Sequence, residues 1–231
     1  MTKIKLDLRL RSVASLVRNG SVVADIGTDH GYLICWLIQN GISPRGIAAD
    51  LRKGPLENAR NTVAECDLED KVELYLSDGL KQLPENCADD IVIAGMGGIL
   101  IAEILSQAKW VFNKNVRIIA QPMTHPEALR EFLIKNGFKI IEEKTSTDGK
   151  HIYCALSAEF SGAEAECDES YYYLGELLEN NDDITKKYIE KMLFTLEKKY
   201  IALKNSNIDD YVGLEKLINE IKLKVSEAYN D

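Results

Sequence analysis

Residues 22–33 read VVADIGTDHGYL, in which a short apolar run ends at a glycine turn and leads into a helical pattern. Strand, glycine turn and helix in this order are typical of α/β proteins that bind a nucleotide at the carboxyl edge of a parallel sheet. Glycine lets the backbone approach a ligand closely, and the start of the helix directs free N–H groups at it. The stretch therefore predicts an α/β fold with a ligand site after its first strand.

The alternation of strands and helices continues outward from this turn as far as residue 159. Several of the apolar runs do not alternate with polar residues, which is typical of parallel strands covered by helices on both faces. The predicted strands are residues 22–27, 46–50, 72–78, 90–96, 116–122, 139–145 and 151–157. The predicted helices between them are residues 32–41, 55–66, 98–112 and 126–137.

The last two predicted strands follow each other across Thr147-Asp148-Gly149, which is a hairpin turn signal. Five βα units that end in a hairpin predict a doubly wound, seven-stranded sheet whose last strand runs antiparallel to the others. This Rossmann-like pattern resembles the class I methyltransferase fold more than a dinucleotide dehydrogenase. An amphipathic helix is also expected before the first strand, because apolar residues recur there at helical spacing between positions 6 and 17.

After residue 159 the composition changes. Residues 161–170 are small and polar, as in a linker, and helical patterns follow at residues 171–180, 184–205 and 210–230. We predict two domains, an α/β domain over residues 1–159 and a helical domain over residues 160–231. The last two helices are expected to form an antiparallel hairpin across residues 206–210. Their apolar stripes favour the core of a monomer, and oligomerisation through them is the alternative.

Length and composition exclude several classes of protein. A chain of 231 residues with 45% hydrophobic and 28% charged residues is too apolar to be disordered and too short for two large domains. No apolar run approaches the roughly 20 residues that a membrane span needs, so a soluble cytoplasmic protein is expected. The five cysteines include no CxxC pair, so we expect most of them to be buried thiols, with neither a disulfide framework nor a metal site.

Asp29 favours one kind of nucleotide cofactor over another. The dinucleotide fingerprint requires glycine at positions 27, 29 and 32, whereas this chain has Asp29 and Tyr32 at the last two. The Asp29 carboxylate would repel a pyrophosphate and attract an ammonium or sulfonium group. The turn therefore favours S-adenosylmethionine over NAD, and the alternative is a turn that only connects strand and helix.

Three more strand ends carry candidate site residues. Asp50 ends the second strand, where a carboxylate can accept hydrogen bonds from both ribose hydroxyls. Asp78 and Gly79 close the third strand, where the carboxylate can accept from an adenine amine. The fourth strand ends in IAGMGG at residues 93–98, whose glycines leave room for a substrate base. The acidic or Asn residue with two prolines and an aromatic that many amino-group adenine methyltransferases carry here is absent, which argues against exocyclic-amine chemistry.

These motifs together identify a family. DIGTDHGYL, KGPLENA at residues 53–59, IAGMGG and AQPM at residues 120–123 resemble the bacterial tRNA (adenine(22)-N(1))-methyltransferase family over residues 6–157. The resemblance implies a methyltransferase that uses S-adenosylmethionine to modify N1 of a tRNA adenine. It assigns to the cofactor Asp25, Gly27, Asp29, His30, Gly31, Asp50, Leu51, Asp78, Gly79 and Gly95. It assigns to the substrate base Met96, Gly97, Gly98, Gln121 and Pro122.

The expected reaction requires the protein mainly to position the two reactants. Adenine N1 has an in-plane lone pair, so it can attack the methyl group without prior deprotonation, and the enzyme mainly has to position the reactants. Attack leaves positive charge on the base, and we expect the Asp29 carboxylate to orient the base and offset that charge. Two alternatives are open. His30 could accept a proton from the base amino group, or Asp29 could bind only the cofactor.

The net charge of −9 is unevenly distributed along the chain. Residues 1–20 carry five cations and one anion, residues 21–157 fourteen cations and nineteen anions, and residues 158–231 nine cations and seventeen anions. Because clustered Lys and Arg bind phosphate, Arg9 and Arg11 are expected to contact tRNA. The acidic surfaces elsewhere would restrict how the RNA docks.

Two other functions compete with this interpretation. A class I methyltransferase could act on a small molecule or a protein, with the helical tail as a lid or dimerisation element. A non-catalytic nucleotide-binding module could use the tail to recruit a partner. The carboxylates of Asp25, Asp29, Asp50 and Asp78 at successive strand ends argue against the second alternative.

Overall fold

The computed structural model describes residues 2–163, 167–206 and 211–229. The chain forms two compact units, Met1–Ala165 and Glu166–Asp231, and the boundary between them falls inside the polar segment 161–170. All seven predicted strands are present in the first unit. They are β1 (Val23–Ile26), β2 (Gly46–Asp50), β3 (Val72–Leu76), β4 (Asp90–Gly97), β5 (Arg117–Thr124), β6 (Phe138–Asp148) and β7 (His151–Phe160).

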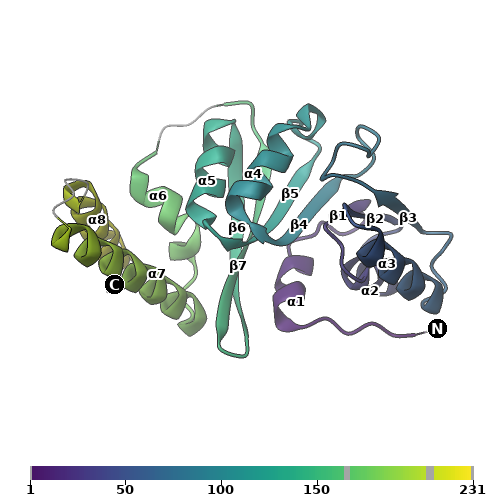
Figure 1. The fold of residues 1–231 in the computed structure, drawn as a ribbon, viewed down its shortest axis with the longest axis horizontal. Helices are drawn as coiled ribbons and strands as arrows, with labels where there is room; N and C mark the ends of the chain where they lie inside the picture. Colours follow the sequence, from purple (N-terminus) through teal and green to yellow (C-terminus); the bar gives the residue numbers. More distant parts are fainter. Residues whose placement is uncertain (1, 164–166, 207–210, 230–231) are drawn as a thin grey trace. The chain divides into compact units, whose positions relative to one another are not determined.

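The strands form one sheet in the order β3-β2-β1-β4-β5-β7-β6 (Figure 1). The first five strands pair in parallel, and β7 pairs antiparallel with both β5 and β6, which confirms the predicted antiparallel last strand. The strand order reverses direction between β1 and β4. In open α/β sheets a ligand crevice forms at such a reversal, outside the carboxyl ends of the strands.

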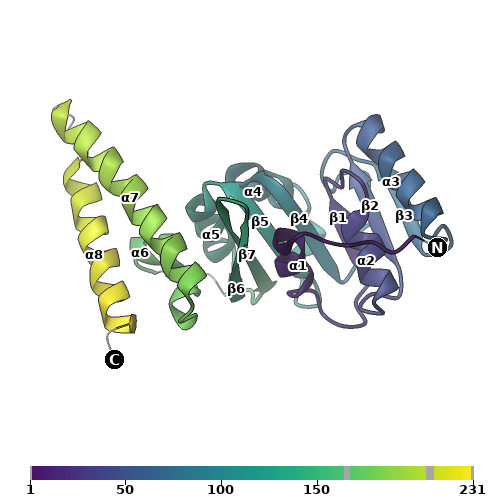
Figure 2. The same cartoon turned by 90° about the horizontal axis from the view of Figure 1, so that it is seen from below.

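Helices cover both faces of this sheet (Figures 1 and 2). One face carries α1 (Leu8–Ala14), α2 (Tyr32–Gln39) and α3 (Lys53–Glu65), and the other carries α4 (Gly98–Ser106) and α5 (Pro126–Lys135). Alternate strand residues enter two separate apolar cores. Val92 and Ile119 pack with α2 and α3, whereas Ile91 and Ile118 pack with α4 and α5. Burial on both faces explains why the strands are apolar without alternation.

The single helix predicted over residues 98–112 is divided in the structure. The helix α4 ends at Ser106, and a short 3-10 helix, η1, follows at Lys109–Val111. Ala108 between them has φ −114° and ψ 79°, which lies outside the helical region. Both pieces pack on the same apolar cluster, so their apolar residues continue one pattern across the break. Periodicity alone therefore predicted one helix where the structure has two.

The N-terminal segment is held on the sheet at both ends of α1. Before the helix, Ile4 and Leu6 are buried, and the Asp7 carboxylate caps α1 by accepting a hydrogen bond from the Leu10 N–H at 2.6 Å. After the helix, Leu16 is buried, and its carbonyl accepts a hydrogen bond at 3.3 Å from a side chain at the start of β5. The α1 helix is therefore a fixed part of the first unit.

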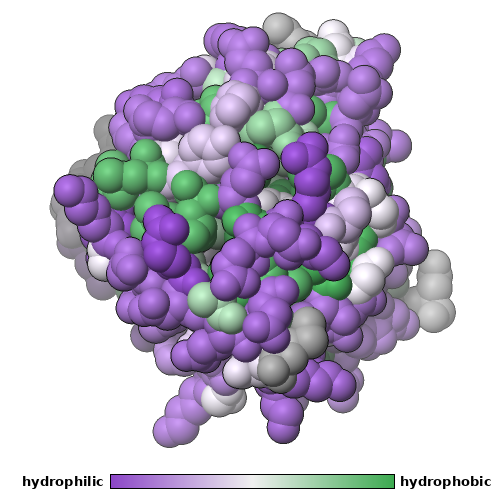
Figure 3. Space-filling view, turned by 90° about the vertical axis from the view of Figure 1, so that its right-hand side faces the viewer, coloured by the Kyte–Doolittle hydropathy of each residue, from purple (hydrophilic) through white to green (hydrophobic). Residues whose placement is uncertain are grey.

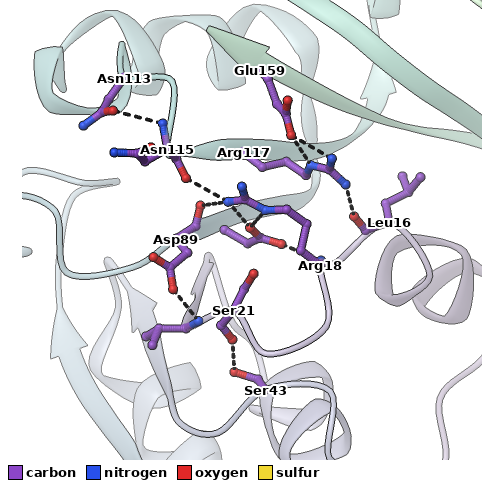
Figure 4. Close-up of polar contacts among 11 residues, drawn as sticks. Leu16, Arg18, Ser21, Ser43, Asp89, Asn113, Asn115, Arg117 and Glu159 are labelled. Atoms are coloured by element: carbon purple, nitrogen blue, oxygen red, sulfur yellow. Dashed lines mark hydrogen bonds and ion pairs between the residues drawn. The ribbon is translucent and has the colours of Figure 1, made fainter.

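Arg18 anchors the end of this segment at the amino edge of β4 (Figure 4). Its Nε donates to the Asp90 carboxylate at 2.7 Å, and its Nη2 donates to the Asp89 and Asn115 carbonyls at 2.7 and 2.9 Å. The Asp90 side chain is fully buried. Arg117 beside this group pairs with Glu159 of β7 at 2.7 Å. Arg18, one of the five N-terminal cations, therefore stabilises the fold.

The second unit is helical, as predicted. It contains α6 (Glu169–Leu174), the 3-10 helix η2 (Leu177–Glu179), α7 (Asp183–Asn205) and α8 (Tyr211–Tyr229). Lys222 pairs with Glu197 at 2.6 Å, and the Tyr200 hydroxyl donates to Glu215 at 2.6 Å. Later residues of α7 thus meet earlier residues of α8, so the two helices form the predicted antiparallel hairpin. Of the predicted break between them, residues 207–210 lie outside the described residues.

Three of the five cysteines are buried. Cys35, Cys66 and Cys154 are buried free thiols, as the sequence predicts. Figure 3 shows mainly hydrophilic residues on the face beside β3 and α3, with a hydrophobic patch among them. Within the described residues, no helix combines the length and the apolar character that crossing a bilayer requires.

Candidate functional site

A cavity of about 480 Å³ lies at the carboxyl edge of the sheet. It opens at the ends of β1 and β4, the neighbouring strands between which the strand order reverses. Its volume is in the range of small-molecule sites. Its walls come from the start of α1, the turn after β1, and the ends of β2 and β4. The sequence-predicted site residues that line it are Arg9, Asp25, Gly27, Asp29, His30, Gly31, Asp50, Gly95 and Met96.

The glycine turn after β1 forms one wall of the cavity. Gly27 has φ +80°, a backbone conformation that other residues rarely adopt, and a Cβ there would lie 2.0 Å from the Cε atom of Met96, so the end of the Met96 side chain would have to move. Gly31 has φ +67° and directly precedes α2, and its N–H donates to the Thr28 hydroxyl at 3.1 Å. The first turn of α2, whose N–H groups lack partners within the helix, therefore begins at the cavity wall.

Asp25 places a buried carboxyl group in this wall. Its pKa is raised from 3.8 to about 6, mainly by burial and to a smaller degree by the nearby Asp50 carboxylate, although a hydrogen bond from Thr28 and the charge of Arg9 act in the opposite direction. The protein alone therefore compensates the charge of Asp25 incompletely. A ligand that brings an ammonium group would stabilise the ionised carboxylate and lower its pKa.

Asp50 is also buried, and it ends β2 at the next position along the sheet edge. Its Oδ1 atom accepts a hydrogen bond from the Arg52 N–H at 2.7 Å, which fixes the orientation of the carboxylate. The Arg52 side chain is 74% exposed, with its Nε atom 3.6 Å from the same oxygen. A fixed carboxylate at the end of β2 is suited to accept hydrogen bonds from ribose hydroxyls.

Asp29 and His30 occupy the open side of the cavity. Their side chains are 69% and 41% exposed, and the His30 Nε2 atom lies 3.4 Å from the Asp29 Oδ2 atom. The His30 ring stacks on Tyr32 with ring centroids 5.1 Å apart and an angle of 10° between the planes. An exposed carboxylate beside two stacked rings at the mouth is accessible to a second, planar substrate.

Arg9 reaches the cavity from α1. Its Nη1 atom donates to the Gln121 Oε1 atom at 3.0 Å, and its guanidinium carbon lies 6.0 Å from the centre of the Tyr153 ring. Gln121 is fully buried, and its Nε2 atom donates to the Pro122 carbonyl at 3.1 Å. The structure thus joins two predicted site residues that lie 112 positions apart in the sequence.

Other predicted site residues lie outside the cavity wall. Gln121 contacts Arg9 but does not line the cavity, Pro122 follows Gln121 on β5, and Leu51 is exposed just after β2. Arg11 is exposed on α1, where its Nε atom donates to the Leu6 carbonyl at 3.1 Å.

Asp78 and the remaining glycines are also absent from the wall. The Asp78 carboxylate, 52% exposed, pairs with Lys81 at 2.5 Å, and Gly79 turns the chain with φ +59°. A Cβ at Gly97 would lie 3.1 Å from the Thr124 hydroxyl oxygen, and one at Gly98 would lie 2.1 Å from the His125 carbonyl oxygen. Close packing of α4 against the end of β5 therefore requires glycine at position 98.

The sequence interpretation omitted several residues of the wall. Thr28 and Tyr32 line the cavity within the glycine turn, and Arg52 lines it just after Asp50. Their positions next to predicted site residues are the signal that could have identified them. No group of residues suited to hold a metal ion occurs within residues 2–163, 167–206 and 211–229.

Comparison with known proteins gives a consistent result. A family model described as a methyltransferase domain matches residues 6–156. The chain is 34% identical over 201 residues to the tRNA (adenine(22)-N(1))-methyltransferase of Bacillus subtilis (strain 168), and the match covers 84% of each chain.

Two solved structures share the fold along nearly the whole chain. The B. subtilis m1A22 tRNA methyltransferase TrmK has a TM-score of 0.84 and 28% identity, with 98% of this chain and 99% of that chain covered. M. capricolum TrmK in complex with S-adenosyl-homocysteine has a TM-score of 0.81 and 26% identity, with 96% and 98% covered. The seven-stranded fold, the matched domain and the sequence identity show that the chain belongs to the bacterial tRNA (adenine(22)-N(1))-methyltransferase family of class I methyltransferases.

Proposed function

We propose that the protein transfers the methyl group of S-adenosylmethionine to N1 of an adenine in tRNA, at position 22 as in the named relative from B. subtilis. The observation that carries the proposal is the cavity between β1 and β4, with buried Asp25 and Asp50 in its wall and exposed Asp29 at its mouth. The activity is expected in the cytoplasm, because that compartment holds the tRNA.

The residues of the cavity fit this cofactor. Gly27 and Gly95 both have positive φ angles, +80° and +81°, and keep the wall free of side chains at the ends of β1 and β4. Three carboxylates suit a ligand with an ammonium group, a sulfonium group and ribose hydroxyls, and they would repel the pyrophosphate of a dinucleotide. When bound, S-adenosylmethionine supplies a methyl group that its sulfonium makes electrophilic.

Each acidic residue has a separate role in this proposal. Asp25 holds the methionyl ammonium group, and Asp50, with Leu51 beside it, holds the ribose. Asp78 and Gly79 follow β3, the strand next to β2, and contact the adenine end of the cofactor. Acidic groups at consecutive strand ends would thus hold the cofactor along the sheet edge.

The target base is proposed to enter at the open side of the cavity, beside Met96. The N1 lone pair needs no base to activate it, so the protein contributes mainly position. Asp29 orients the target base and offsets the positive charge that develops on it. His30, 3.4 Å from Asp29, is the alternative group and would accept the proton of the base amino group.

Recognition of the tRNA is assigned to other surfaces. Arg11 is exposed on α1 and can contact phosphate. The predicted domain over residues 1–159 carries the chemistry, and the domain over residues 160–231 contributes to the choice of substrate. The second candidate function, methylation of a small molecule or a protein, would need no such RNA surface.

The experiment that tests the proposal measures the modified nucleoside directly. The protein is incubated with labelled S-adenosylmethionine and unmodified tRNA, and the tRNA is digested and separated into nucleosides. We expect label in N1-methyladenosine, and none when adenine 22 of the tRNA is replaced by guanine. Label in small metabolites or protein, with unlabelled tRNA, would show that the competing methyltransferase function is correct.

A further inference from the structure

A second cavity, the amino-edge groove, lies at the opposite ends of the strands from the cofactor cavity. Its volume is about 690 Å³, and it forms where the segments that precede β4 and β5 meet the end of β7. The two cavities share no lining residue, so the groove is separate from the site of the proposed methyl transfer. The residues that line the groove are Glu85, Asn86, Lys109, Trp110, Phe112, Asn113, Lys114, Asn115 and Phe160.

Aromatic side chains form the apolar part of the amino-edge groove. Phe112 and Phe160 are half-buried, with ring centroids 5.8 Å apart and an angle of 65° between the planes. Both also pack edge-on against the buried Phe138, at 5.1 and 5.3 Å, which restricts their rings. Trp110, which lines the same groove, is half-buried as well. Partly exposed rings with restricted orientation are suited to a planar group, because aromatic faces favour stacking.

Two lysines give the groove positive charge. The Lys109 Nζ atom lies 4.7 Å from the centre of the Phe112 ring, and Lys114 is exposed. Over the part of the chain that the structure describes, neither lysine forms an ion pair with an acidic side chain. Glu85 is the one acid among the described residues that line the groove. A ligand with negative charge would therefore compensate charge that the protein itself leaves uncompensated.

Three asparagines add hydrogen-bonding groups, and the loop that carries two of them is held in place (Figure 4). The Asn115 carbonyl accepts from the Arg18 Nη2 atom at 2.9 Å, and the Asn115 N–H donates to the Asn113 Oδ1 atom at 3.0 Å. Asn86 has φ +58°, a left-handed conformation that asparagine adopts more readily than most residues. Side-chain amides offer donors and acceptors together, which matches the edge of a nucleic-acid base.

We propose that the amino-edge groove binds a nucleoside monophosphate unit, either as a free nucleotide or within a short RNA strand. The phosphate pairs with Lys109 and Lys114, and the base contacts Trp110 and Phe160. Glu85 accepts hydrogen bonds from ribose hydroxyls. The combination of cations, aromatic rings and amides carries this assignment, because a simple anion would use only the cations and an apolar peptide only the rings. The assignment does not depend on the proposed function.

Tryptophan fluorescence tests the proposal, because Trp110 lines the groove and the chain has one other tryptophan. The full chain carrying Trp36→Phe is titrated with adenosine 5′-monophosphate. We expect saturable quenching that persists in excess S-adenosyl-homocysteine, the ligand expected in the cofactor cavity. Adenosine alone and inorganic phosphate alone should bind at least about tenfold more weakly, because each lacks part of the contacts.

Lysine variants connect the affinity to the groove. Lys114→Met should raise the dissociation constant of adenosine 5′-monophosphate by about tenfold, because a charge-assisted contact with the phosphate is lost. The weaker affinity for adenosine should stay unchanged, which also shows that the variant is folded. Lys71→Met is the matched control, since Lys71 is exposed just before β3 and does not line the groove. It should leave both affinities unchanged.

A 5′-phosphorylated tetraadenylate distinguishes the two sources of the ligand. Tighter binding of this oligonucleotide than of adenosine 5′-monophosphate supports the groove as a site for an RNA strand, and equal or weaker binding supports it as a site for the free nucleotide. Both outcomes require the loss of affinity in Lys114→Met.

Three results would overturn the proposal. The first is the absence of quenching up to millimolar nucleotide. The second is displacement of the nucleotide by S-adenosyl-homocysteine, which would assign it to the cofactor cavity. The third is an equal effect of Lys114→Met and Lys71→Met. None of these results bears on the methylation of tRNA, so the proposed function stands or fails by its own test.

Discussion

Buried carboxylates at the two edges of the sheet differ in how far the protein compensates their charge. At the amino edge, Asp90 is fully buried, and its two carboxylate oxygens accept hydrogen bonds from the backbone N–H and the Nε of Arg18 at 2.7 Å each. At the carboxyl edge, burial of Asp25 outweighs the nearby charge of Arg9, and the pKa of Asp25 rises to about 6. The two carboxylates lie on the neighbouring strands β4 and β1. A charge that stabilises the fold is compensated by the chain itself, whereas a charge at a ligand site is compensated by the ligand.

The largest expected effect on stability comes from breaking the ion pair between Arg18 and Asp90. In Arg18→Met, Asp90 stays buried without its cation, and breaking a buried pair in this way is expected to lower the free energy of unfolding by about 3 kcal/mol. Urea unfolding followed by tryptophan fluorescence measures it, because Trp36 and Trp110 both lie in the first unit. Arg45→Met is the control, since its ion pair with Glu73 is exposed and is worth less than about 1 kcal/mol. Equal effects of the two substitutions would contradict the contrast between the edges.

Removing the charge of Asp25, which the protein compensates incompletely, should stabilise the protein. Asp25→Asn removes a charge whose burial shifts the pKa from 3.8 to about 6, so the ligand-free protein should become more stable at pH 7.5, by up to about 3 kcal/mol. The same substitution at the amino edge, Asp90→Asn, should destabilise the protein, because it breaks the pair with Arg18. Asp25→Asn should also bind S-adenosylmethionine more weakly, as in other trade-offs between stability and function.

The pH dependence of this stabilisation has a defined sign. Because the pKa of Asp25 is higher in the folded protein than in the unfolded chain, the stability that this group contributes is complete below pH 3.8 and is lost as the pH rises through about 6. The advantage of Asp25→Asn over the wild-type protein should therefore be largest above pH 6 and disappear toward pH 4. Urea unfolding at several pH values measures it, and an advantage independent of pH would show that the buried charge is not its cause.

The smallest expected effect concerns Asp29, which is exposed at the mouth of the cavity. Asp29→Asn should lower the single-turnover rate of tRNA methylation by about tenfold, because an exposed carboxylate offsets the charge on the base only partly. Calorimetry with S-adenosylmethionine separates the alternatives. A loss of cofactor affinity with an unchanged rate at saturation would make Asp29 a cofactor ligand only. A rate loss in His30→Gln but not in Asp29→Asn would assign the chemical role to His30.

The structure confirms the strands that the sequence predicted, whereas the roles assigned to the site residues stay predictions. Unbroken apolar runs identify strands because burial on both faces is a local requirement, and the turn at Asp148-Gly149 indicated the antiparallel last strand. The break at Ala108 was not predicted, because both helical pieces continue one apolar pattern. Gly98 was interpreted as room for a base, whereas the structure shows that the His125 carbonyl oxygen lies where its side chain would be.

The sequence by itself determined the fold class and the acidic character of the site, because strand patterns and residues at strand ends depend on positions close together in the chain. Only the tertiary structure decided which side chains share the cavity. Arg9 meets Gln121 across 112 positions, and Asp78 pairs with Lys81 outside the cavity wall. The burial that raises the pKa of Asp25 likewise depends on neighbouring elements that fold over it. Distances between remote residues and the loss of solvent around a charge arise only when the sheet is assembled.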